Sequence, residues 1–91
     1  MSQANFAMPL SLLVIDDNVE LLAVVRRYFT QRPEFAPPQV FNRVPDALAY
    51  LQGHRVDVAL VDLHLPDDSG VRGIRRVVEL AAADHVIAFT G

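Results

Sequence analysis

An α/β fold built on a parallel β-sheet is the architecture that the sequence predicts, from three observations. Two strongly apolar runs, typical of strands buried on both faces, occupy residues 10–15 and 56–63, the second interrupted by Asp57. Segments with the apolar spacing of helices follow them, and this alternation favours parallel strands joined by right-handed crossovers. A chain of 91 residues has room for one hydrophobic core. We therefore expect a single domain over residues 1–91.

The expected elements alternate between strand and helix. In chain order they occupy residues 10–15, 19–31, 39–42, 45–53, 56–63, 71–83 and 86–89. The first run stops abruptly at Asp16, as a buried strand stops at a sheet edge. Leu22, Val25 and Phe29 share one helical face, which predicts the first helix, and Pro33 ends it.

The second half of the chain follows the same pattern. Pro45 suits the first turn of a short helix, and Gly53 suits its end. The second apolar run carries Asp62 near its end, and a turn-forming segment precedes the last helix. The inner face of that helix is predicted to carry Ile74, Val77, Val78 and Ala81. The last strand runs to Phe89 and is followed by Thr90.

Composition and charge exclude several classes of function. The formal net charge of -3 gives no basic stripe for a phosphate backbone, so direct nucleic-acid binding is not expected. The chain has no cysteine, which excludes disulfides and thiolate chemistry. No apolar run approaches the roughly 20 residues that span a bilayer, and residues 1–10 lack the basic start of a signal peptide. We expect a cytoplasmic domain without membrane contact.

Polar side chains are predicted to gather at one edge of the sheet. Asp16 and Asp17 follow the first strand, Asp62 ends the third, and Thr90 follows the last. Parallel strands place their carboxyl ends at the same edge, about 4.8 Å apart when they are neighbours. Carboxylates at about 4 Å repel by roughly 1–4 kcal/mol per pair, depending on the local dielectric. A hard divalent cation, Mg²⁺, would relieve this repulsion.

The same acids suggest a reaction. Carboxylate attack on phosphorus gives an acyl phosphate, provided that a metal and neighbouring donors stabilise the added charge. Asp62 is the expected nucleophile because it lies between the other strand-end residues in the predicted sheet, and Thr90 is expected to donate its hydroxyl to a phosphoryl oxygen.

Each residue also has a structural interpretation. Asp17 opens a capping-box spacing that ends at Glu20, Asp62 alone fits a solvated strand end, and Thr90 alone is an ordinary strand residue. The coincidence of these residues at strand ends favours the functional interpretation. His64 with Asp62 could form a transition-metal pair, but the spacing suggests no third nitrogen or sulfur ligand. Between Pro66 and Gly70, two residues are expected to be turn formers: Asp67 and Asp68.

Three segments carry a resemblance to a known family. They are LLVIDD, which ends in Asp16 and Asp17, VALVDLHLPDDSG around Asp62, and VIAFTG, which contains Thr90. With these motifs the chain resembles the response-regulator receiver domains of two-component signalling over residues 10–91. The resemblance implies a flavodoxin-like, doubly wound parallel sheet of order 2-1-3-4, with the family's fifth strand and last two helices missing.

The resemblance also implies residue roles. Asp62 is the implied phosphoacceptor, Asp17 an implied direct ligand of Mg²⁺, and Asp16 an implied ligand through water. The backbone carbonyl of His64 completes the implied protein ligands, and Thr90 is the implied switch residue. Two further residues match positions that shape the loop after the third strand: Pro66 and Gly70.

The chain departs from the family in one respect. The family's fifth strand begins with a lysine that pairs with the phosphoryl group, whereas all eight basic residues here are arginines. We expect a receiver domain that is incomplete at its C-terminus and truncated after the fourth strand. An exposed fourth strand and uncovered apolar surface would then favour self-association as a dimer.

Three functions follow from these observations. The leading one is a signalling module, not an enzyme, that accepts a phosphoryl group on Asp62 from a sensor histidine kinase or phosphotransfer protein. The alternative is a phosphorylation-deficient, receiver-like scaffold or dimerisation fragment, which the missing lysine favours. A phosphohydrolase is disfavoured, because the second acid expected two residues after the nucleophile is His64 here.

Overall fold

The structure, a computed structural model, describes residues 9–66 and 69–90, and it contains a four-stranded parallel sheet of order β2-β1-β3-β4. The elements are β1 (Leu12–Ile15), α1 (Val19–Thr30), β2 (Gln39–Phe41), α2 (Val44–Leu51), β3 (Val56–Asp62), α3 (Ser69–Leu80) and β4 (Ala83–Phe89). The predicted fold class and strand order are confirmed. The expected turn residues Asp67 and Asp68 lie outside the described residues.

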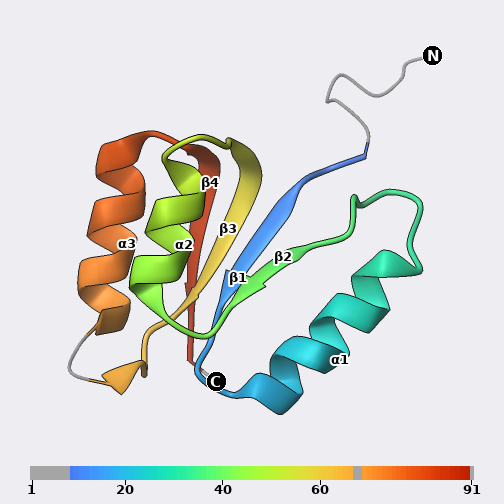
Figure 1. The fold of residues 1–91 in the computed structure, drawn as a ribbon, viewed down its shortest axis with the longest axis horizontal. Helices are drawn as coiled ribbons and strands as arrows, with labels where there is room; N and C mark the ends of the chain where they lie inside the picture. Colours follow the sequence, from blue (N-terminus) through green and yellow to red (C-terminus); the bar gives the residue numbers. More distant parts are fainter. Residues whose placement is uncertain (1–8, 67–68, 91) are drawn as a thin grey trace.

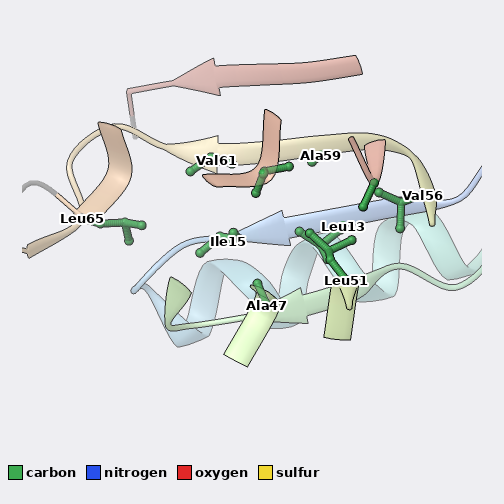
Figure 2. Close-up of a cluster of buried hydrophobic side chains, with 10 residues drawn as sticks. Leu13, Ile15, Ala47, Leu51, Val56, Ala59, Val61 and Leu65 are labelled. Carbon is green, nitrogen blue, oxygen red and sulfur yellow. The ribbon is translucent and has the colours of Figure 1, made fainter. Parts of the chain in front are cut away.

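Helices cover both faces of the sheet. In Figure 1, α2 and α3 lie side by side over one face, while α1 lies apart from them. The larger core lies under α2 and α3 and is shown in Figure 2; its buried members include Leu13, Ile15, Ala47, Leu51, Ala59, Val61 and Val77. A smaller core joins Leu12 and Val14 of β1 to Leu22 of α1 on the opposite face. None of the described helices is long and apolar enough to cross a membrane.

The strand register brings the chemistry-bearing residues to one edge. Ile15 of β1 is paired with Val61 of β3, so the residues that follow them, Asp16 and Asp62, come to the same level. Asp62 is itself paired with Phe89 of β4. The carboxyl ends of these three strands therefore meet, as parallel pairing requires.

The first two strands and helices lie within a few residues of the prediction. β1 begins at Leu12, two residues later than predicted, and Leu10 makes an isolated bridge with Phe35. The predicted inner face of α1 is confirmed, since Leu22 is buried and both Val25 and Phe29 pack against the same cluster.

The end of α3 differs from the prediction. The helix ends at Leu80, not at residue 83, because Ala81 has a left-handed backbone with φ of 54°. That change of direction lets β4 begin at Ala83, earlier than predicted, where Ala83 pairs with Val56. The prediction that Val78 lies on the inner face is wrong, because its side chain is 57% exposed; Ala81 is exposed as well.

At the amino-terminal edge of the sheet, Ser11 and Asp57 form a hydrogen-bonded clasp between β1 and β3. Asp57 Oδ2 accepts from the Ser11 backbone N–H at 2.7 Å and from the Ser11 hydroxyl at 3.0 Å. The backbone N–H of Asp57 in turn donates to Ser11 Oγ at 2.8 Å. This strand-start clasp ties the two central strands together at the edge opposite the acids.

Candidate functional site

Three carboxylates meet at the carboxyl edge of the sheet. One ligand oxygen from each of Asp16, Asp17 and Asp62 lies within 4.8 Å of the other two. The acids line an open hollow together with Asn18, Leu21 and His64. The predicted gathering of acids at one rim is therefore present, and its oxygen donors are those that a hard cation such as Mg²⁺ prefers.

The sheet and a tight turn fix two of these acids. Asp16 and Asp62 are 2% and 4% exposed. Each lies two residues after a strand residue that packs in the core beneath α1, Val14 and Leu60, so it is on the same face of the sheet. Asp16 Oδ1 accepts a hydrogen bond of 2.8 Å from the backbone N–H of Asn18. In the same way, Asp62 Oδ1 accepts one of 2.8 Å from the backbone N–H of His64. Each acid thus keeps its second oxygen for another partner.

Asp16 has the least favourable environment of the three acids for a charged carboxylate. Its Oδ2 is buried and has no hydrogen-bond partner among the described residues. Burial raises the pKa of Asp16 above its ordinary value, and the nearby charges of Asp62 and Asp17 raise it further, against the lowering effect of the Asn18 N–H. A buried, unsatisfied carboxylate oxygen is costly unless something binds it. The donor set and this orphan oxygen both fit a divalent cation.

Asp17 is exposed, and it is not the helix cap. The residue that caps α1 is Asn18, whose side-chain oxygen accepts from the backbone N–H of Leu21 at 3.0 Å. The capping-box interpretation of Asp17 is therefore wrong by one residue. Its carboxylate is left facing the hollow that it shares with Asp16 and Asp62.

Gly70 is required for close packing. A Cβ on Gly70 would collide with the backbone oxygen of Asp62 and would lie 2.9 Å from two backbone atoms of Leu63. A left-handed backbone is not the reason, because no described glycine has a positive φ. Gly70 lies in the first turn of α3, so the missing side chain lets this helix begin directly against the end of β3.

The other predicted site residues lie around the rim at greater distance. The His64 side chain lines the acidic hollow but is not part of the group within 4.8 Å. Pro66 is exposed and lines a neighbouring hollow that also includes Asp17 and Arg43. Thr90 follows β4 and is exposed, and it is not among the described residues that line the acidic hollow.

Two lining residues were not predicted from the sequence. Asn18 and Leu21 belong to the start of α1, which closes one side of the hollow. The sequence signal that could have pointed to Asn18 is its residue type and place, because Asn directly before a helical pattern is a preferred N-cap residue.

Comparison with known proteins decides the family. The sequence profile of the response regulator receiver domain matches residues 12–91. The chain belongs to this family. The receiver domain is also 33% identical over 78 residues to a protein-glutamate methylesterase/protein-glutamine glutaminase 2 of Anaeromyxobacter dehalogenans (strain 2CP-C). That match covers 86% of this chain and 23% of the relative, so the enzyme activities in the relative's name belong to that longer protein.

Solved structures share the receiver fold. The MaeR response regulator bound to beryllium trifluoride superposes with a TM-score of 0.74 and 20% identity, over 90% of this chain and 67% of that chain. A response regulator protein from Burkholderia pseudomallei, with a phosphorylated aspartic acid, calcium ion and citrate, gives a TM-score of 0.60 and 22% identity, over 89% and 60%. At these identities the likeness establishes the fold.

Proposed function

We propose that this receiver domain accepts a phosphoryl group on Asp62 from a sensor histidine kinase or phosphotransfer protein. The observation that carries the proposal is the meeting of Asp62 with Asp16 and Asp17, one atom of each within 4.8 Å of the others, in an open hollow. The domain acts as a signalling module, not as an enzyme. It comprises residues 1–91, and the cores on both faces of one sheet support a single folding unit.

The proposed cofactor is Mg²⁺. Asp17, Asp62 and the backbone carbonyl of His64 would bind it directly, and Asp16 would bind it through water. The buried, unpartnered Oδ2 of Asp16 and the exposed carboxylate of Asp17 support this set, because oxygen ligands and retained waters suit Mg²⁺. When bound, the cation would offset the negative charge that accumulates as a phosphoryl donor approaches three carboxylates.

The chemical step falls to Asp62. A carboxylate oxygen of Asp62 attacks phosphorus, forming an O–P bond of an acyl phosphate while the N–P bond of the donor histidine breaks. The electron pair of that bond stays on the imidazole nitrogen. The His64 N–H, which already donates to Asp62 Oδ1, holds the carboxylate in place.

The remaining residues have supporting roles in the proposal. Thr90 would donate its hydroxyl to the phosphoryl group; its position after the β4 end that pairs with Asp62 supports this, and its exposure leaves room for a change of rotamer. Gly70 and Pro66 would shape the β3–α3 connection, which the close approach of Gly70 to the Asp62 backbone supports.

We further propose that the domain acts in the cytoplasm and self-associates as a dimer. Among the described strands β4 has a neighbour on one side alone, and Ile87 on it is 49% exposed. Open strand edges with apolar side chains favour pairing with a second chain. Sedimentation of the chain over a concentration series tests this, and a folded monomer at every concentration would refute the dimer.

Acetyl phosphate with Mg²⁺ is the direct test of phosphorylation. Intact-mass analysis should show one added phosphoryl group that hydroxylamine removes, as expected for an acyl phosphate. Asp62→Asn should abolish the addition, while Asp84→Asn, at an exposed acid on β4, should leave it unchanged. A wild-type chain that folds, binds Mg²⁺ and yet gains no phosphoryl group would favour the scaffold alternative.

A further inference from the structure

The outer face of α3 carries a group of arginines. Arg75 and Arg76 follow Arg72 by three and four residues, so the three lie on one side of the helix, and all three are exposed. Glu79 is the single acid within the helix. Three arginines against one glutamate give the segment a formal charge of +2, although the whole chain carries -3.

The positive charge of α3 is not balanced within the helix. Its first turn has no acidic residue, so no carboxylate there offsets the arginines. Arg72 and Arg76 are four residues apart, where like charges destabilise a helix by about 0.2–0.5 kcal/mol. Arg75 and Arg76 make no ion pair with any described residue. The guanidinium groups of Arg75 and Arg76 are therefore available to a partner outside the described residues.

Apolar side chains lie beside the guanidinium groups. Val71 and Val78 are 54% and 57% exposed, and they lie about one helical turn before and after Arg75. α3 packs on α2, β3 and β4 with its opposite side, and in Figure 1 no described element covers the outer face. Exposed aliphatic groups next to arginines are typical of protein-binding surfaces, where Arg is enriched.

We propose that the outer face of α3 binds an acidic segment of a partner protein. Carboxylates of the partner pair with Arg75 and Arg76, and an aliphatic side chain of the partner packs on Val71 and Val78. A guanidinium group suits this role because its fork of donors binds a carboxylate through two hydrogen bonds. A protein is favoured over nucleic acid because the chain is acidic overall and has carboxylates clustered at the sheet edge. The proposal does not depend on phosphorylation of Asp62.

The probe is a helical peptide with two glutamates four residues apart and a leucine between them on the same face. Titration of the ¹⁵N-labelled chain should shift the amide signals of α3, and added salt should weaken the binding. The double variant Arg75→Glu with Arg76→Glu should bind at least about tenfold more weakly. It should instead bind a matched peptide with lysines in place of the glutamates. A matched control changes two exposed arginines of α1, Arg26→Glu with Arg27→Glu, and should bind as the wild type does.

Unfolding curves must first show that both double variants fold, and Arg75→Gln with Arg76→Gln provides a milder version of the first. Equal loss of binding in the α3 and α1 variants would mean that general charge attraction explains the result, and would overturn the proposal. Stronger binding to duplex DNA or to phosphatidylglycerol vesicles than to the peptide would overturn it as well, as would the absence of α3 shifts.

Discussion

The strand pair β1–β3 holds a carboxylate at each of its two ends, and the two have opposite surroundings. At the amino-terminal edge, Asp57 accepts two hydrogen bonds from Ser11. These bonds, the backbone one first, hold the pKa of Asp57 below its ordinary value. At the carboxyl edge, Asp16 accepts one hydrogen bond, its buried Oδ2 has no partner within residues 9–66 and 69–90, and burial raises its pKa.

This difference separates an acid that stabilises the fold from one whose charge opposes it. The carboxylate of Asp57 is hydrogen-bonded by Ser11, so its charge contributes to the stability of the fold. Asp16 is not satisfied, so its charge opposes folding until a ligand compensates for it. The pKa values of both residues are shifted, in opposite directions, and the raised value belongs to the acid at the edge where we propose a metal site.

The largest expected effect is that of Mg²⁺ on stability. At a concentration a hundred times its dissociation constant, the ion should raise the free energy of unfolding by about 2.7 kcal/mol. Asp16→Asn should reduce this increment because it removes a charge from the acidic hollow, whereas Asp57→Asn should retain it. Urea unfolding with and without Mg²⁺ measures both. An increment that is unchanged by Asp16→Asn would contradict the assignment of the carboxyl edge as the metal site.

Removal of the strand-start clasp comes next. Asp57→Ala should lower the free energy of unfolding by about 2 kcal/mol, because hydrogen bonds to a charged group are lost and the Ser11 donors lose their partner. Asp84→Ala is the matched control at the same edge. Its exposed ion pair with Arg55 should contribute at most about 1 kcal/mol. A larger loss in the control than in Asp57→Ala would reverse the expected ranking.

A smaller change of opposite sign is expected at the carboxyl edge. Without metal, Asp16→Asn should raise the free energy of unfolding by about 1 kcal/mol, because it relieves like-charge repulsion and keeps the oxygen that accepts from Asn18. Asp17→Asn should act in the same direction but less, since Asp17 is exposed. Metal-free urea unfolding measures both variants. Destabilisation by both would show that the clustered acids do not oppose folding.

The smallest expected effect is the pH dependence of the clasp. The pKa of Asp57 is lower in the folded chain than its ordinary value of 3.8. Its contribution to stability is therefore complete above that value and is lost as the pH falls through the folded pKa. The stability difference between wild type and Asp57→Asn should shrink below about pH 4. If the stability difference grew as the pH fell, the pKa of Asp57 would be raised by folding, not lowered.

Much of the fold was predictable from local patterns. Apolar runs located β1 and β3, and the spacing of Leu22, Val25 and Phe29 located α1 with the correct inner face. Where two neighbouring positions competed, local patterns failed. Asn18 caps α1 in place of Asp17, and in α3 the neighbouring residue Val77 is buried while Val78 is exposed.

The sequence by itself determined that acids follow β1 and end β3, and that parallel strands must bring such ends to one edge. Tertiary structure alone decided how each acid is surrounded. The pairing of Ile15 with Val61 places Asp16 beside Asp62, and Gly70 allows α3 to pack against the end of β3. At the other edge, Ser11 contacts Asp57 although 46 residues separate them in the chain. These contacts depend on strand register and on the approach of whole elements. A side-chain pattern repeats every two residues in a strand and every 3.6 in a helix, so it identifies the buried face but not its partner.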